Sequence, residues 1–293
     1  MKHSIIAAMV LVVFTCCHAG MCLASGSYDL VQHVPGGVIN WTGLFVEAKG
    51  SGTTPPAEKN PAAGWETALQ RAERDAYRGM VTAFRPLRLS GNWRVKDLVD
   101  KNDQMLAKIE RLMQSAEVSD IIYSSEGTVE VVRRMQIPGA LSQLILPEYI
   151  VQLEMKNLGE RLSVEPDNEV FTGLVIDARG VDFEPAMCFS VYDETGREVY
   201  GPAYVSREFV VRKGMCSYFK NMAAVEGSRR AGPRPLAVKA LKTRRPGGTQ
   251  LVISNTDAAR LRSTVDNLFF LRRCRVIVVR DAFDSDENRK AGP

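Results

Sequence analysis

Histidine is scarce in this chain, and the few histidines lie close to its start. Only three of the 293 residues are histidines. The last of them, His33, lies in the N-terminal segment before the first predicted strand, which we expect to be poorly structured. A Ser–His–Asp triad needs a positioned histidine base, and a histidine zinc site needs three or four converging ligands. We therefore expect no catalytic residue, no metal ligand and no bound cofactor.

Long apolar runs are also missing once the N-terminus is passed. No later stretch approaches the about 18 residues that a membrane-spanning helix needs, so we expect no transmembrane segment in the mature chain. The net charge of +4 is too small by itself to indicate nucleic acid binding. With 45% hydrophobic and 25% charged residues, the composition is that of a globular protein with one large domain or two smaller ones.

The first 24 residues have the form of a secretory signal peptide. A basic start at Lys2 is followed by an apolar stretch over residues 4–17, which is too short to span a bilayer comfortably. Small residues follow at Ala24 and Ser25. We predict cleavage between Ala24 and Ser25 and a periplasmic mature chain. An uncleaved N-terminal membrane anchor is the alternative.

Six cysteines bear on lipid anchoring and on disulfides. Those at positions 16, 17 and 22 follow Thr15, Cys16 and Met21, whereas a lipoprotein signal needs a small residue before the modified cysteine. We therefore favour a soluble mature protein over one anchored to the outer membrane by lipid. The spacing of Cys188, Cys216 and Cys274 excludes a CxxC pair. Either these three are buried thiols, or Cys188 and Cys216 form a disulfide.

The first half of the mature chain predicts a strand, a long helix, a second helix and a hairpin. Asn60 is a plausible N-cap with Pro61 at the first helical position, and apolar residues then recur at three- and four-residue steps until Pro86. The predicted elements are a strand at 37–48, a linker at 50–60, helices at 61–85 and 102–115, and a hairpin at 118–137 that turns at residues 125–128.

The second half predicts several short strands and a late helix. Strands are expected at 172–178, 186–192, 197–200, 207–212, 236–242, 249–254 and 274–281, and a helix capped by Ser254 or Asn255 is expected to run to about residue 271. The continuous apolar run of the last strand places it inside a sheet. We predict an α+β fold of two small α+β domains, each with a mixed or antiparallel sheet covered by helix.

The predicted boundaries follow from these elements. They are a signal peptide at 1–24, an N-terminal domain at 25–147, a connector at 148–170, a C-terminal domain at 171–281 and a disordered tail at 282–293.

A basic segment at residues 229–245 is the strongest candidate binding feature. It contains seven Lys or Arg residues and no acid: Arg229, Arg230, Arg234, Lys239, Lys242, Arg244 and Arg245. One interpretation is a contact surface for anionic lipid head groups, cell-wall polymers or an acidic partner. The other is a solvated loop around one short strand. We do not expect nucleic acid binding, because no aromatic residue lies among these basic residues to stack on a base.

Three acidic residues, Asp177, Asp182 and Glu184, follow the first predicted strand of the second half. They could form a small carboxylate site for a cation or an acid–base pair. We favour a turn over residues 177–180, since Asp and Gly at a strand end are typical of turns.

Two blocks of sequence resemble known proteins. The first comprises GVINWTGLFVEAKG, ALQRAERDAYRGM, LSGNWRVKDLV and SEGTVEVVRRMQIPGALSQLIL, and it resembles the N-terminal domain of Lpp-twenty-type envelope lipoproteins and of flagellar assembly protein T. The second comprises FTGLVIDARG, DETGREVYGPAYVSRE and CRVIVVRD, and it is similar to the C-terminal extension of longer exported relatives. The resemblance implies a helix laid across a small sheet and a non-enzymatic envelope role. For the flagellar relative, it implies a ring around the motor.

These observations lead to three functional hypotheses. We expect a non-catalytic exported envelope protein that acts in structure or assembly through protein–protein contacts, including self-association, at the flagellum or the outer membrane. The alternative is a periplasmic binding module for an anionic envelope component, which uses residues 229–245 and contacts membrane or cell wall peripherally. The third is an enzyme of unrecognised type around the acidic residues of 177–184.

Overall fold

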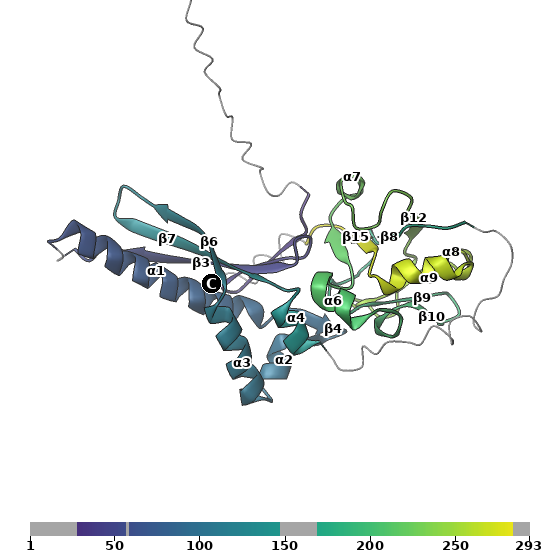
Figure 1. The fold of residues 1–293 in the computed structure, drawn as a ribbon, viewed down its shortest axis with the longest axis horizontal. Coiled ribbons are helices and arrows are strands. Elements are labelled where there is room, and N and C mark those ends of the chain that lie inside the picture. Colours follow the sequence, from purple (N-terminus) through teal and green to yellow (C-terminus); the bar gives the residue numbers. More distant parts are fainter. Residues whose placement is uncertain (1–27, 57–58, 147–168, 284–293) are drawn as a thin grey trace, which may run out of the picture.

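The computed structural model describes residues 28–56, 59–146 and 169–283 (Figure 1). Its N-terminal half is a five-stranded antiparallel sheet with the order β1-β2-β3-β7-β6. Helix α1 (Pro61–Phe84) lies along one face of this sheet, mainly over β3 and β7. The strands are β1 (Val31–Val34), β2 (Gly37–Asn40), β3 (Phe45–Thr53), β6 (Glu117–Tyr123) and β7 (Thr128–Gln136).

The start of α1 confirms its prediction. The side chain of Asn60 accepts a hydrogen bond of 3.1 Å from Ala62 N, and Pro61 occupies the first helical position. The linker predicted at 50–60, however, starts too early, because residues 50–53 continue β3. The two glycines there are required by packing: a Cβ on Gly50 would lie 2.0 Å from the backbone nitrogen of Ala76 in α1. Small residues on both elements let helix and strand approach closely.

The predicted strand at 37–48 is also wrong in part, since it is two strands, β2 and β3, with a turn over residues 41–44. In that turn Asn40 Oδ1 accepts a hydrogen bond from Gly43 N at 2.8 Å. The lead before it is structured, because β1 pairs with β2 through a tight turn in which Gly36 has a φ of +82°. His33 therefore lies on a strand, where its side chain is exposed, and not in an unstructured lead.

Smaller elements complete the N-terminal half. The predicted helix at 102–115 is confirmed as α3 (Asp103–Gln114), and the β6–β7 hairpin is confirmed with Gly127 at a φ of +78°. Between α1 and α3 lie β4 (Arg88–Ser90), β5 (Trp93–Arg94) and α2 (Val95–Val99), and α4 (Ala140–Ile145) follows the hairpin.

The C-terminal half contains two four-stranded sheets. One is fully parallel, with the order β11-β15-β8-β12, and the other is mixed, with the order β10-β9-β14-β13. All four residues of β15 are buried between β11 and β8, which confirms the predicted internal strand. The strands are β8 (Leu174–Asp177), β9 (Ser190–Tyr192), β10 (Glu198–Tyr200), β11 (Ser217–Phe219), β12 (Leu236–Lys239), β13 (Lys242–Thr243), β14 (Gln250–Val252) and β15 (Val276–Val279).

Three predictions for this half are wrong. The strand expected at 236–242 is two strands, β12 and β13, which belong to different sheets. The strand expected at 207–212 is helix α6 (Arg207–Lys213), because a short apolar run does not distinguish strand from helix by its periodicity. The helix expected up to residue 271 is two helices, α8 (Asn255–Arg262) and α9 (Val265–Arg272). The side chain of Thr264 accepts a hydrogen bond from Asn267 N and so caps a new helix start. The short elements η1 (Pro202–Tyr204) and α7 (Ala223–Glu226) complete the half.

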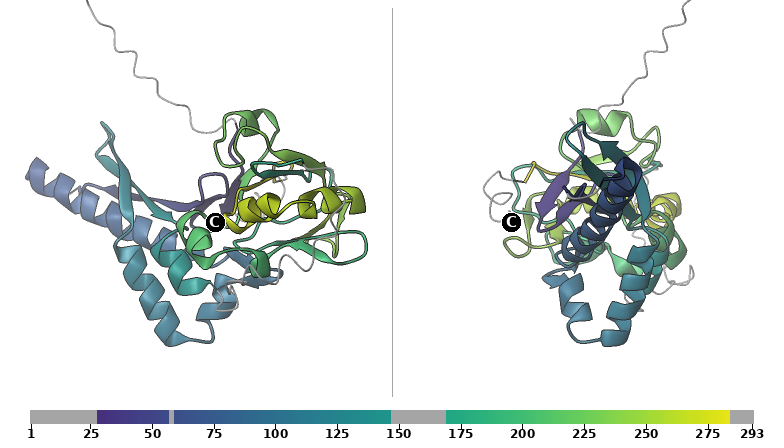
Figure 2. Two further views of the ribbon diagram at one scale, coloured as in Figure 1. Left: turned by 45° about the vertical axis from the view of Figure 1, so that its right-hand side comes forward. Right: turned by 90° about the vertical axis from the view of Figure 1, so that its left-hand side faces the viewer.

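The two halves dock through backbone and side-chain contacts, and one cluster of buried apolar residues continues through both. The rings of Trp41 and Tyr218 meet edge to face at 5.7 Å. Residues 187 and 188 donate backbone hydrogen bonds to the carbonyl oxygens of Arg88 and Leu89 in β4. Helices and sheets are thus combined in an α+β fold, with the β6–β7 hairpin pointing away from the C-terminal half (Figure 2).

Several predictions fall outside the described residues. These are the cleavage site at Ala24 and Ser25, the leader cysteines, the connector from residue 148 to 168, and the tail from residue 284. Phe283 belongs to the tail that was predicted to be disordered from residue 282, but it is buried, so that prediction is wrong at this residue. In the described ranges, no helix combines the length and apolar character that crossing a membrane requires.

Candidate binding site

The predicted basic segment does not form one surface. Arg229, Arg230 and Arg234 precede β12, whereas Lys239 ends β12 in the parallel sheet, opposite Asp177 of β8. Lys242, Arg244 and Arg245 lie beyond it, in β13 and the β13–β14 loop of the mixed sheet. The seven basic side chains are therefore divided between two sheets, and all but Arg230 are exposed.

Arg230 is a structural residue. Its guanidinium donates four hydrogen bonds of 2.7–3.1 Å, to the carbonyl oxygens of Lys213, Gly214 and Cys274 and to Oγ of Ser217. Two of these carbonyls lie at the C-terminal end of α6, where helix carbonyls have no partner within the helix. Arg230 thus ties the end of α6 to the first residue of β11 and to Cys274 before β15, and its charge is directed inward.

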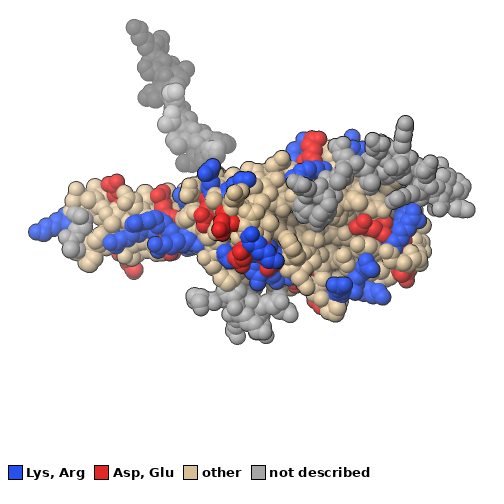
Figure 3. Space-filling view, turned by 90° about the horizontal axis from the view of Figure 1, so that it is seen from below, with Lys and Arg blue, Asp and Glu red and all other residues tan. Residues whose placement is uncertain are grey.

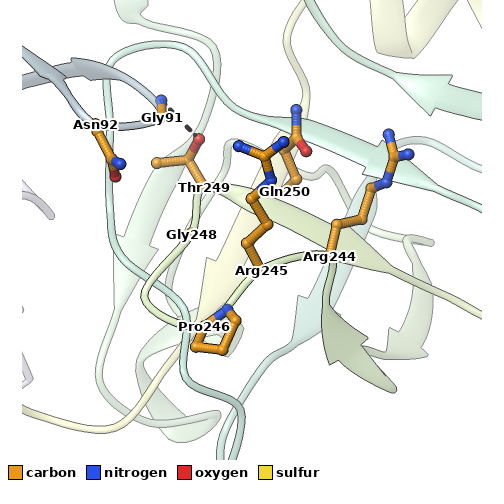
Figure 4. Close-up of a pocket in the computed structure, with 8 residues that line it drawn as sticks. All are labelled: Gly91, Asn92, Arg244, Arg245, Pro246, Gly248, Thr249 and Gln250. Atoms are coloured by element: carbon orange, nitrogen blue, oxygen red, sulfur yellow. Dashed lines mark hydrogen bonds between the residues drawn. The ribbon is translucent and has the colours of Figure 1, made fainter.

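Arg244 and Arg245 form one side of an open hollow of about 440 Å³ between the two halves (Figure 4). The opposite side is the β4–β5 turn, with Gly91 and Asn92. In Figure 4 both guanidinium groups point to the same side of the β13–β14 loop. The remaining lining residues come from that loop and the start of β14: Pro246, Gly248, Thr249 and Gln250.

The two walls of the hollow are joined by a hydrogen bond. Gly91 N donates to Oγ1 of Thr249 at 2.9 Å, and Thr249 is buried. Gly91 has a φ of +54°, which a residue with a side chain adopts only with strain. This bond holds the β4–β5 turn of the N-terminal half against the mixed sheet of the C-terminal half.

The β13–β14 loop is held in place by carboxylate and backbone contacts. Oδ2 of Asp182 accepts a hydrogen bond of 2.6 Å from Gly247 N, and Glu184 N donates to the carbonyl oxygen of Gly248 at 3.0 Å. The Arg244 guanidinium lies over the ring of Tyr192, 4.4 Å from its centroid. These contacts fix the position from which both arginines extend.

Both walls of the hollow are contacted by a triad of Arg88, Glu184 and Arg280, which we call the arginine–glutamate triad. The Glu184 carboxylate lies 3.5 Å from a guanidinium nitrogen of Arg88 and 3.7 Å from one of Arg280. Both arginine side chains are only 11% exposed and the glutamate side chain 17%. Arg88 also donates to the carbonyl oxygen of Gly91 at 2.9 Å. The triad therefore supports both walls, through the β4–β5 turn and through residue 184.

The acidic residues are engaged separately rather than gathered into one carboxylate site. Asp177 accepts hydrogen bonds from the backbone and guanidinium of Arg179, which lower the pKa of its carboxyl, and Gly180 has a φ of +75°. The predicted turn at residues 177–180 is thereby confirmed. Asp182 accepts a hydrogen bond from the β13–β14 loop, and Glu184 belongs to the arginine–glutamate triad. Within the described ranges no group of three His, Cys, Asp or Glu side chains is arranged to hold a metal ion.

Cys188, Cys216 and Cys274 are free and buried, so the disulfide proposed between Cys188 and Cys216 is wrong. Burial raises the pKa of the Cys188 and Cys216 thiols to about 12 and that of Cys274 to about 11. Thiols of this kind are poor nucleophiles at neutral pH. They belong to the core and not to the hollow.

The hollow has the chemistry of an anion site. Guanidinium groups bind carboxylate or phosphate through paired hydrogen bonds, and the amides of Asn92 and Gln250 can add donors. Among the residues that the structure describes, no carboxylate lines the hollow and neither Arg244 nor Arg245 has an ion-pair partner. On the face shown in Figure 3, by contrast, basic and acidic side chains are interspersed, as on an ordinary soluble surface.

The sequence indicated only two of the eight residues that line this site. It identified Arg244 and Arg245 but missed the four polar and glycine residues that face or adjoin them, Gly91, Asn92, Thr249 and Gln250. The Ser-Gly-Asn sequence at residues 90–92 is a turn signal, yet nothing in it indicates which distant loop it meets.

Comparison with known proteins bears on the C-terminal half. No curated protein matches the chain. A family model, in contrast, matches residues 173–282. This region includes Arg244 and Arg245 of the hollow and excludes the β4–β5 turn. Residues 173–282 are similar to a protein family described as Treponema pallidum Tp0624, second domain.

Proposed function

We propose that this chain is a non-catalytic exported protein of the bacterial cell envelope that binds an anionic group of an envelope component in the hollow. One observation carries the proposal: two neighbouring guanidinium groups, Arg244 and Arg245, extend into a polar hollow without an ion pair to any described residue. An unpaired pair of arginines attracts carboxylate or phosphate.

Export supports the choice of ligand. The leader at residues 1–24, with cleavage predicted between Ala24 and Ser25, directs the chain to the periplasm. Anionic lipid head groups, cell-wall polymers and acidic proteins are all present there, and each carries carboxylate or phosphate groups. Peripheral contact with membrane or cell wall is the expected mode of binding.

Sedimentation of the mature chain with isolated bacterial envelopes tests the proposal. The Arg244→Ala/Arg245→Ala variant should lose most of the bound fraction at about 0.05 M salt, and the wild type should release as salt approaches about 0.5 M, because screening weakens exposed charge contacts. The matched control is Arg229→Ala/Arg234→Ala, which removes two exposed charges of the same segment away from the hollow.

Equal loss in both double variants would mean that net charge, and not the hollow, governs binding. Unchanged sedimentation of the Arg244→Ala/Arg245→Ala variant would contradict the proposed site directly.

A second candidate function is structure or assembly through protein–protein contacts, at the flagellum or the outer membrane. The resemblance of the N-terminal half to Lpp-twenty-type lipoproteins and to flagellar assembly protein T supports it, and so does strand β6, which is exposed along its length. Crosslinking in living cells tests this role. Recovery with basal-body or outer-membrane proteins is expected, and recovery as a partner-free monomer would contradict it.

A further inference from the structure

Strand β6 presents an open sheet edge that is unusually apolar. It ends the sheet order, all seven of its residues are exposed, and no strand of the described ranges borders its outer side. Four of the ten large apolar side chains that are exposed in those ranges lie on this strand: Val118 (37%), Ile121 (39%), Ile122 (44%) and Tyr123 (56%). Open edges with apolar side chains are templates for pairing with another chain.

The backbone groups that face outward can be assigned from the ladder. Ser124 N donates to the carbonyl oxygen of Thr128, so residues 124, 122 and 120 form the hydrogen-bonded pairs with β7. The backbone groups of Ile121 and Tyr123 therefore point away from β7. Their N–H and C=O groups form a row that an added strand would satisfy.

The two faces of the edge differ in chemistry. Ile121 and Tyr123 lie opposite Val131 and Val129, which are buried under α1, so their side chains are on the α1 face. There the Tyr123 ring meets Trp65 of α1 edge to face at 5.6 Å. On the other face Asp120 and Ile122 alternate with them, and Asp120 forms no ion pair with a described residue.

We propose that this edge binds an extended segment of a partner protein in which apolar residues alternate with Lys or Arg. The apolar side chains would lie beside Ile121 and Tyr123 on the α1 flank, and a basic side chain would meet Asp120 on the opposite face. Strand β6 carries two acids, Glu117 and Asp120, and no base, so charge complementarity selects a basic partner.

A second copy of this chain fits the edge poorly. Antiparallel pairing of two β6 strands would gather four carboxylates in one ribbon with no cation between them. The register irregularity between Val118 and Asp120 also leaves only residues 120–123 regular enough for pairing. This inference rests on the assembly role above and specifies the partner's chemistry.

The test uses the mature chain and two capped hexapeptides, VKVKVK and VEVEVE. VKVKVK should slow hydrogen exchange at the amides of Ile121 and Tyr123, read by NMR, and VEVEVE should not. Asp120→Lys should weaken VKVKVK binding by roughly two- to fivefold, the contribution of one exposed charge pair, and should admit VEVEVE. Glu126→Lys makes the same charge change in the hairpin turn and should leave both affinities unchanged.

Three outcomes would overturn the inference: no protection by VKVKVK, equal protection by both peptides, or protection of these amides by dimerisation without any peptide. Crosslinking to envelope proteins is measured separately. If VKVKVK gives no protection but crosslinks to envelope proteins form, the β6 site alone is refuted. If no crosslinks to envelope proteins form, the assembly role is refuted.

Discussion

Replacement of Arg230 by alanine should destabilise the fold, whereas the same change at its neighbour Arg229 should not. The Arg230 guanidinium donates four hydrogen bonds of 2.7–3.1 Å, three of them to backbone carbonyls. Arg229 is exposed. Both side chains carry one positive charge, so the pair separates an internal structural role from a general electrostatic one.

The magnitude follows from these bonds. A hydrogen bond from a charged donor contributes about 1.5–3 kcal/mol, and water can replace part of this in the variant because the side chain is only partly buried. We therefore expect Arg230→Ala to lower the free energy of unfolding by about 4 kcal/mol. For a chain of this size, that corresponds to a fall in Tm of roughly 8–16 °C.

Urea unfolding followed by circular dichroism measures this difference. Arg229→Ala should lie within about 0.5 kcal/mol of the wild type, as exposed substitutions usually do. If Arg230→Ala unfolds within about 1 kcal/mol of the wild type, the four hydrogen bonds do not hold α6 in place and the reasoning fails.

Three further perturbations test the packing and charge arguments. Gly50→Ala should lower the free energy of unfolding, measured in urea, by at least about 3 kcal/mol, because its Cβ would meet the α1 backbone. The control Ser51→Ala, at an exposed position, should leave it unchanged, and equal losses in both variants would refute the close approach. Glu184→Gln should lower the free energy of unfolding by about 3–5 kcal/mol, because the guanidinium groups of Arg88 and Arg280 would lose the charge of their carboxylate. An unchanged free energy of unfolding would contradict this and would show that water solvates these groups instead. The three core thiols ionise near pH 8.5 when unfolded and at about 11 to 12 when folded, so the unfolded state holds fewer protons between these values. The free energy of unfolding should therefore fall as pH rises from about 9 to 11, more steeply than in a triple Cys→Ala variant; parallel profiles would contradict buried thiols.

The elements with strong local signals could be predicted from the sequence. Helix α1 has an Asn–Pro start and a sustained helical period, the β6–β7 hairpin has a glycine at its turn, and β15 is a continuous apolar run. Each signal resides in the residues that form the element, and each is confirmed. The α+β class follows from these elements.

Elements whose conformation depends on distant contacts could not be predicted. Residues 50–53 have the composition of a linker and are a strand because α1 packs onto their glycines. Helix α6 has an apolar run typical of a strand, and its end is held by Arg230 from elsewhere in the chain. Nothing in the Arg229–Arg230 pair itself shows which of the two turns inward.

The candidate site shows the same division. A run of basic residues indicated anion binding, but only the fold shows that Arg244 and Arg245 alone of the seven reach the hollow. Their opposite wall comes from the β4–β5 turn, more than one hundred residues earlier, through the bond between Gly91 and Thr249. No local motif encodes a site assembled in this way.

The most direct test of the hollow is the affinity of the mature chain for pyrophosphate, measured by isothermal titration calorimetry. We predict measurable binding by the wild type and by Arg229→Ala/Arg234→Ala, and at least about a tenfold loss of affinity in Arg244→Ala/Arg245→Ala, since each charged hydrogen bond contributes about 1.5–3 kcal/mol. The same affinity in all three proteins would contradict an anion site formed by Arg244 and Arg245.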